Sequence, residues 1–200
     1  MNPLEHVREY SNAPKYRCVA RELLYPDRAG EKIFERYFAK ANISREAFER
    51  YRRGYTNHSN NSNEVAVIEN NFRYLFERSR PPFRAARFNA ETYPALYTAK
   101  DIETAKAERK YYVDPLWKFE YAVYSVYVTA HTADLRPWED CGELTFDGDH
   151  RSCQALADSI RHSVDGVSWY SLRGAGSCCA FFSCDGVAAG QVEEEGSWPD

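Results

Sequence analysis

The hydrophobic positions in the N-terminal part of the chain follow a helical period. In segment 64–78, apolar residues recur every three or four positions and stop before Pro81, which predicts one α-helix whose buried face carries Val65, Ile68, Phe72, Leu75 and Phe76. Segment 31–42 has the same spacing, and Ser44 is placed to cap a further helix that ends at Gly54. Segment 56–63, TNHSNNSN, is typical of a polar loop. With one short strand over 16–20, residues 1–80 are predicted to be mostly helical.

After the two prolines at 81 and 82 the pattern changes to period two. WKFEYAVYSVYVTA, residues 117–130, predicts a long central strand, and segments 167–172 and 178–184 predict two shorter ones. A helix is expected over 152–162, and segment 191–200 is expected to be a flexible, solvated tail. Helices followed by mixed strands and helices predict an α+β fold. We expect a single domain over 1–200, in which 31–80 is either a helical insertion or an N-terminal helical subregion.

Charge and cysteine usage narrow the function classes. The formal net charge of -4 provides no positive field for nucleic acid, so direct nucleic acid binding is not expected. No apolar run has the length of a signal peptide or a membrane span, which predicts a cytoplasmic protein without membrane contact. The six cysteines include no C-x-x-C pair, so reduced thiols are expected and no metal site.

The segment RFNAETYPALYTAKDIETAKAE, from Arg87 to Glu108, places potential chemistry in a short unit. It is predicted to form strand, loop, strand, turn and helix, with Tyr97 on the second strand and Asp101 as the helix cap. An arginine leaving a strand offers a planar donor fork suited to phosphate, and a glutamate on the helix can face the same site. A surface ion pair between the two is the alternative that spacing alone leaves open.

Two groups of residues in this chain resemble the RES domain family, which is named for an arginine, a glutamate and a serine. The first group is Arg87-Phe88-Asn89, then Pro94-Ala95-Leu96-Tyr97, then Glu108 on the helix. The second is the stretch DGVSWYSLRGAGS, which supplies Asp165, Gly166, Tyr170, Ser171, Arg173 and Gly174. Tyr16-Arg17 resembles the pair found on the family's first strand. Phe88 stands where the family has tryptophan, and Tyr170 where it has proline.

The resemblance implies a fold like the ADP-ribosyltransferase toxins, with a mixed two-sheet core around a cleft and here a helical N-terminal block. It also implies that NAD+ is consumed as a substrate. Arg87, Glu108 and Ser171 would be the catalytic residues: Glu108 would stabilise an oxocarbenium-like ribose, Arg87 would hold the pyrophosphate, and Ser171 would bind the ribose or orient Glu108. Tyr97 would line the nicotinamide pocket, and Arg17 and Arg173 are further candidates for phosphate contacts.

Several functions remain open after this comparison. A toxin-like enzyme could hydrolyse or phosphorolyse NAD+, or it could transfer ADP-ribose to a protein. A catalytically inactive RES-like module that binds a regulatory protein is the alternative from another class. The resemblance further implies an antitoxin or immunity protein as the partner that covers the cleft, with action in the cytoplasm of the producing cell or of a target cell.

Two other motifs are interpreted structurally. RGAGS, residues 173–177, lacks the lysine of a phosphate-binding loop and is predicted to be a turn. FDGDH, residues 146–150, lacks the spacing of a calcium loop and is predicted to be a polar loop or hairpin. No histidine is placed by a hydrolase motif beside Ser171 or a cysteine.

Overall fold

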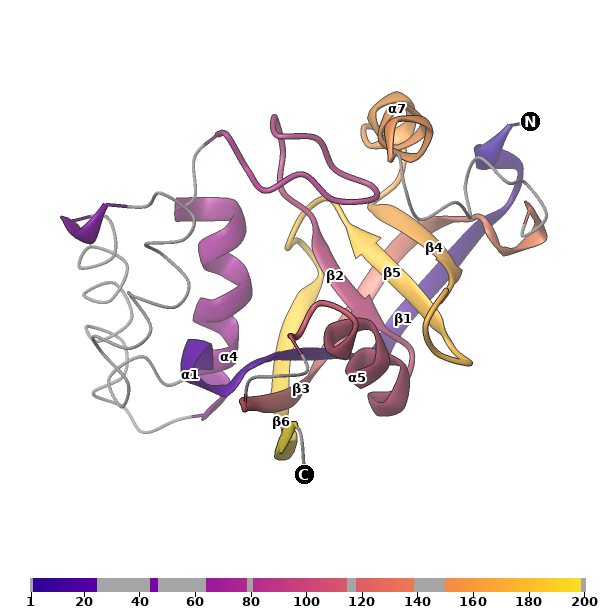
Figure 1. The fold of residues 1–200 in the computed structure, drawn as a ribbon. Helices are drawn as coiled ribbons and strands as arrows, with labels where there is room; N and C mark the ends of the chain where they lie inside the picture. The colour runs from indigo at the N-terminus through magenta and orange to yellow at the C-terminus, as the bar shows by residue number, and fades with distance from the viewer. Residues whose placement is uncertain are drawn as a thin grey trace.

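The computed structural model describes residues 2–24, 44–46, 64–78, 81–114, 118–138 and 150–198. Figure 1 shows the arrangement of their helices and strands. The helix predicted over 31–42, most of the helix predicted after Ser44, the loop over 56–63 and nearly all of FDGDH lie outside these residues.

The described elements are a mixture of strands and helices in one mostly antiparallel sheet arrangement, as expected for an α+β fold. In chain order they are η1 (Pro3–Glu5), β1 (Val7–Ala20), α1 (Arg21–Leu24), α4 (Glu64–Arg73), the π-helical turn η4 (Tyr74–Arg78), β2 (Leu96–Ala99), α5 (Ile102–Lys110), β3 (Phe119–Asp134), η5 (Arg136–Trp138), α7 (Arg151–Ile160), β4 (Gly166–Tyr170), β5 (Ser177–Phe181) and β6 (Val187–Trp198). The strand β1 is longer than predicted, since it takes 14 residues from Val7 to Ala20. The strand predicted over 16–20 is the C-terminal end of β1.

β3 is the strand to which most of the sheet is attached. It pairs antiparallel with β1, from Val7↔Ala133 to Ala20↔Tyr121. Its other edge pairs antiparallel with β6 and then, over its last residues, parallel with β4. β4 continues to β5, β5 to β2, and β2 returns to β1 through the pair Tyr16↔Ala99. Five strands therefore close a ring, with β6 added outside it.

This topology corrects two expectations. We predicted two small mixed sheets, but the described strands belong to one six-stranded sheet. We also predicted a flexible tail over 191–200, but residues up to Trp198 belong to β6. The indole of Trp198 stacks on Tyr121 at 4.2 Å between ring centroids and on Phe119 at 5.7 Å. The run of glutamates is typical of a solvated tail, which is why this strand was not predicted. In the structure these glutamates form ion pairs: Glu194 with Lys106 and Glu195 with Arg21.

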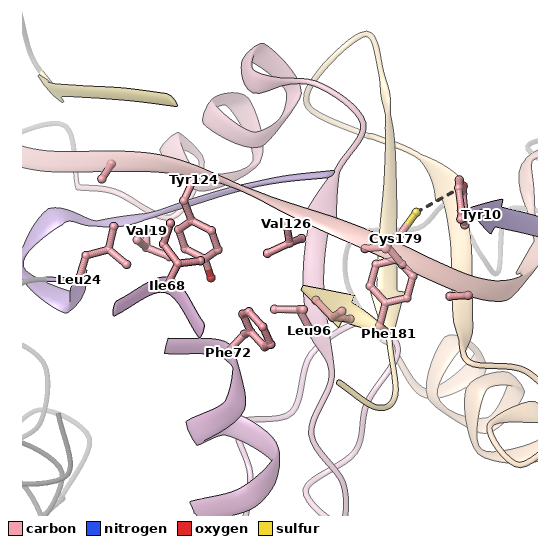
Figure 2. Packing of buried hydrophobic residues seen from close by; sticks show 14 residues of the cluster. Tyr10, Val19, Leu24, Ile68, Phe72, Leu96, Tyr124, Val126, Cys179 and Phe181 are labelled. Carbon is pink, nitrogen blue, oxygen red and sulfur yellow. Dashed lines mark hydrogen bonds between the residues drawn. The ribbon is translucent and has the colours of Figure 1, made fainter. Parts of the chain in front are cut away.

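The main core lies between the inner face of the ring and α4. Ile68 and Phe72 of α4 are fully buried there against Leu96, Tyr124 and Val126 from the strands (Figure 2). The hydroxyl of Tyr124 donates a hydrogen bond to Asn71 Oδ1 at 3.0 Å, so this buried phenol has its partner on the same helix. The helical face predicted for 64–78 is thus confirmed at Ile68 and Phe72.

Two further clusters cover the outer face of the ring. One lies under α7, where Cys153, Ala157 and Ile160 meet Val167 and Ala180. The other lies under α5, where Ala105 meets Cys18, Ala99, Val123 and Cys178. In Figure 1, α7 lies near β4 and α5 lies in front of β2 and β5. The same strands therefore support a core on both faces.

Truncation of Phe72 tests how α4 is attached. Phe72→Ala is expected to lower the free energy of unfolding by about 3–5 kcal/mol, because it removes a fully buried ring and leaves a cavity. Val65→Ala, at an exposed position of the same helix, should change it by about 0.5 kcal/mol or less. Urea unfolding of both variants measures the difference. Equal, small effects would show that α4 does not pack on the sheet.

The buried thiols predict a loss of stability at alkaline pH. Burial raises the pKa of Cys18 from its ordinary value of 9.0 to about 12, and burial also raises that of Cys179. The unfolded chain loses these protons near pH 9 while the folded chain keeps them. Stability is therefore unaffected by these groups below that pH and falls above it, by up to about 1.4 kcal/mol per pH unit for each thiol. Urea midpoints between about pH 8 and about pH 10 should fall less steeply in Cys18→Ala, and an identical slope would contradict the assignment.

Candidate active site

Helix α5 begins at a side-chain cap that the sequence predicted. Asp101 has an extended backbone, and its Oδ1 accepts a hydrogen bond from the N–H of Thr104 at 2.7 Å. This satisfies one of the free donors of the first turn. Glu108 lies two turns further along the same helix. The cap thus sets where Glu108 stands relative to the strands.

A loop after β4 lies directly on the first turn of α5, and it can do so because it contains glycines. A Cβ on Gly176 would stand 2.3 Å from both Asp101 Oδ2 and Thr104 Oγ1, and one on Gly174 would stand 3.1 Å from the Cα of Thr104. No larger residue fits at 176 without displacing the cap. RGAGS is therefore a turn, as predicted, whose glycines serve close packing.

The turn brings two donors to one carboxylate. Ser171 Oγ donates a hydrogen bond to Glu108 Oε1 at 2.6 Å, and Arg173 Nη1 donates to Glu108 Oε2 at 2.9 Å. The serine oxygen itself accepts the N–H groups of Arg173 at 3.0 Å and Gly174 at 2.8 Å. Because both acceptor positions of the hydroxyl are taken, its proton is directed at Glu108. The Glu108 side chain keeps 24% of its surface exposed, whereas Arg173 keeps 10%.

The sheet beneath this group contributes Cys178 and Trp169. The two residues face each other across β5 and β4, and Cys178 Sγ lies 3.8 Å from Glu108 Oε1. Burial raises the pKa of Cys178, and the negative charge of Glu108 raises it further, so the group stays a neutral thiol at physiological pH. It lines the site without adding a second negative charge.

Tyr97 and Arg87 lie further along this face. Tyr97 pairs with Ala180 two positions from Cys178, so both side chains stand on the same side of the sheet. The ring of Tyr97 is 6.1 Å from that of Trp169, and its hydroxyl accepts the N–H of Phe88 at 2.8 Å and donates to Asn89 Oδ1 at 3.0 Å. Burial raises the pKa of Tyr97, so this hydroxyl stays protonated. Its role in the structure is to hold the turn that carries Arg87.

Arg87 is not on a strand, in contrast to our prediction. It lies in a tight turn closed by hydrogen bonds between Ala86 and Asn89, and it is buried. Burial raises the pKa of both Tyr97 and Cys153, and the positive charge of Arg87 acts in the opposite direction on both groups. The cation that pairs with Glu108 in the described part of the chain is Arg173.

The predicted site residues thus fall into three places. Glu108, Ser171 and Arg173 are in direct contact. Tyr97 stands on the same face of the sheet, with its ring 6.1 Å from that of Trp169, and Arg87 lies in the turn that the Tyr97 hydroxyl holds. Arg17 does not join them: it pairs with Tyr124 of β3 and shares the inner face of the ring, where its Nη1 reaches Tyr97 only at the carbonyl oxygen, at 3.5 Å.

The sequence profile of the RES domain matches residues 62–199. This chain belongs to the RES domain family. The match includes the segments that carry Arg87, Glu108 and Ser171, and it begins after β1, although β1 is paired along most of its length with β3 of the RES domain.

Comparisons with individual proteins add little to the family assignment. A search of curated proteins found no match. Among solved structures, a chain of the crystal structure of the M. tuberculosis MbcT-MbcA toxin-antitoxin complex is similar, with 15% sequence identity and a TM-score of 0.41. The alignment covers 56% of this chain and 70% of that chain.

Sequence reasoning missed several groups around the carboxylate of this RES domain. Trp169 and Cys178 were assigned only to strands, and Tyr111 and Tyr112 were not singled out. The guanidinium carbon of Arg173 lies 3.9 Å from the ring centre of Tyr111 and 5.3 Å from that of Tyr112, and both tyrosines are exposed. A tyrosine pair directly after the helix that bears Glu108 was the available signal.

Other site types find no support in the described residues of the RES domain. No group of three or more histidine, cysteine, aspartate or glutamate side chains there could hold a metal ion. Within the same residues, no helix combines the length and apolar character that crossing a bilayer requires.

Substitution of Gly176 tests whether the packed turn positions the donors. Gly176→Ala should displace the turn from Asp101 and Thr104 and weaken both hydrogen bonds to Glu108. We expect a loss of about 1–3 kcal/mol of stability, the usual result of overpacking. Ala175→Ser, at the exposed neighbouring position, is the control and should be close to neutral. Thermal unfolding measures both, and equal midpoints would mean that the turn is not held against α5.

Proposed function

We propose that this RES domain is a toxin-like enzyme that cleaves the bond between nicotinamide and ribose in NAD+. The observation that supports it is the carboxylate of Glu108, which is held by Ser171 and Arg173 and remains partly open to solvent on a face that also carries Tyr97 and Trp169. An anchored anion beside aromatic rings suits a substrate with a cationic ring and a sugar.

Cleavage of the bond between nicotinamide and ribose requires a negatively charged group in a fixed position. As the C–N bond to nicotinamide breaks, its electron pair leaves with the nicotinamide and positive charge develops on the ribose. Glu108 would stabilise that charge. A carboxylate already oriented by two donors needs no reorganisation when the charge appears, which is the basis of electrostatic catalysis. Ser171 would act by orienting Glu108 or by binding a ribose hydroxyl.

The remaining residues would bind the substrate. Arg87 would hold the pyrophosphate through its planar donor fork, and Arg173, already next to Glu108, is placed for a second phosphate contact. Tyr97 and Trp169 would line the nicotinamide pocket. The inner-face position of Arg17 gives it no direct part in this arrangement, so it would act at most by supporting β2 through its contact with Tyr97.

The group that accepts ADP-ribose defines the reaction class. Attack by water would give free ADP-ribose, and attack by phosphate would give its 1″-phosphate. Depletion of cellular NAD+ by either reaction is the function we favour, since the oriented carboxylate serves cleavage itself. Transfer to a protein side chain would appear as a mass increase on that protein, which separates an ADP-ribosyltransferase from the other two.

An enzyme of this kind would need control in the cell that makes it. We propose an antitoxin or immunity protein that covers the site, acting in the cytoplasm of the producing or the target cell. Three large exposed side chains near Glu108 support this: Tyr111 and Tyr112 after α5, and Leu172 between Ser171 and Arg173. Exposed apolar groups gathered at one place are typical of a protein interface.

Replacement of the carboxylate tests the mechanism. Glu108→Gln should reduce nicotinamide release from NAD+ at least about a hundredfold, the size of loss expected when one transition-state-stabilising group is removed. Glu103→Gln, at an exposed position of the same helix, should retain wild-type release. The assay is nicotinamide release by the purified chain with water alone, with phosphate and with lysate, and mass spectrometry identifies the product. Normal turnover in Glu108→Gln would exclude the mechanism, and no release by the wild type under any condition would favour a binding module.

A further inference from the structure

The inner face of the sheet carries a buried lysine for which the described residues supply no carboxylate partner. Lys15 of β1 is 4% exposed, yet in the described part of the chain no aspartate or glutamate forms an ion pair with it. Its Nζ lies 4.0 Å above the ring centre of Tyr10, and the guanidinium carbon of Arg8 lies 5.2 Å from the same ring. Two cations thus share one aromatic ring.

The charges around Lys15 are also mainly positive. Burial lowers the pKa of Lys15, and the charges of Arg8, Arg136 and Lys100 act in the same direction, whereas Cys179 acts in the opposite direction. The nearby Asp134 is bound to Arg136, whose Nε donates to it at 2.7 Å, and the charge of Arg8 also acts on this carboxylate. A buried ammonium group that stays charged normally has an acidic partner, and none of the described residues supplies one to Lys15.

The polar groups next to these cations are suited to an anion. Thr98 precedes Lys100 by two residues and is buried, and its hydroxyl has no hydrogen-bond partner among the described residues. Thr98 pairs in register with Cys179, whose Sγ contacts the hydroxyl of Tyr10 at 3.6 Å (Figure 2). Cations and an unpartnered hydroxyl therefore gather in one neighbourhood.

This neighbourhood is separated from Glu108 by the sheet. Thr98, Cys179 and Ser168 pair across β2, β5 and β4. Cys178 and Trp169, which lie next to Glu108, are the adjacent residues on β5 and β4 and therefore point to the other face. An anion held near Lys15 would not contact the groups that we propose to cleave NAD+.

We propose that Lys15, Arg8 and Lys100 form a binding site for a small phosphoryl anion, either inorganic phosphate or a phosphate monoester, on the inner face of the sheet. Three cations neutralise a doubly charged phosphate, and the hydroxyl of Thr98 supplies a further donor. Arg8 and Lys100 are exposed and would contact an anion that arrives from solvent. Lys15 would contribute a buried positive charge. Because β2 carries Thr98 of this site and Tyr97 of the active-site face, an anion bound there would stabilise a strand that both sites share.

Inorganic phosphate is the first probe of this site. In the full chain, phosphate should raise the thermal unfolding midpoint saturably compared with chloride at equal ionic strength, because a ligand of the folded state stabilises it. Lys15→Met and Arg8→Gln should each weaken the dissociation constant, measured by calorimetry, at least about tenfold. Arg161→Gln, which removes a cation over the ring of Tyr93 elsewhere, is the matched control and should bind as the wild type does. Glycerol phosphate in place of phosphate distinguishes a monoester from the free ion.

Two comparisons keep this result separate from the proposed catalysis. Glu108→Gln should bind phosphate as tightly as the wild type, and loss of binding there would overturn the assignment to the inner face. In the absence of phosphate, Lys15→Met should unfold at a higher temperature than the wild type, because an unpartnered buried charge is removed. A lower midpoint, or unchanged phosphate binding in Lys15→Met and Arg8→Gln, would also overturn the proposal.

Discussion

The backbone of β3 must form hydrogen bonds along both edges over 16 residues, and the rest of the sheet is arranged around this requirement. One edge is satisfied by β1, and the other first by β6 and then by β4. Where β3 exchanges β6 for β4, the sheet continues from β4 to β5 and β2, and β2 closes the ring by pairing with β1. The position of this exchange therefore determines which residues of β2, β4 and β5 face the candidate active site.

The candidate active site shows how little sequence is needed to orient a carboxylate. Glu108 extends from a helix whose start is set by Asp101, and its two donors come from a turn that lies on that same start. Gly176 makes the contact possible because it adds no side chain at the point of closest approach. The helix cap, the turn and the carboxylate therefore form one unit, and the geometry of the acid depends on packing at the opposite end of its helix.

The sequence was sufficient to predict the elements that depend on residues close together in the chain. The apolar positions Ile68 and Phe72, the cap at Asp101 and the period-two pattern of β3 all predicted their elements to within a few residues. Each of these signals is local, since helical spacing, a capping side chain and strand alternation act over one or two turns. The approach of Ser171 to Glu108 was also expected, through the motifs of the family rather than from any physical pattern.

What only the tertiary structure decided involves partners distant in sequence. The edge strand that ends at Trp198 has an acidic sequence typical of a tail, and it becomes a strand because β3 supplies its hydrogen bonds and Lys106 one of its counter-charges. Arg87 occupies a turn held by the hydroxyl of Tyr97, and Arg173 is the cation that reaches Glu108. Local sequence determined which elements form, but the pairing of charges and strand edges depends on which segments meet in space, and no local pattern carries that information.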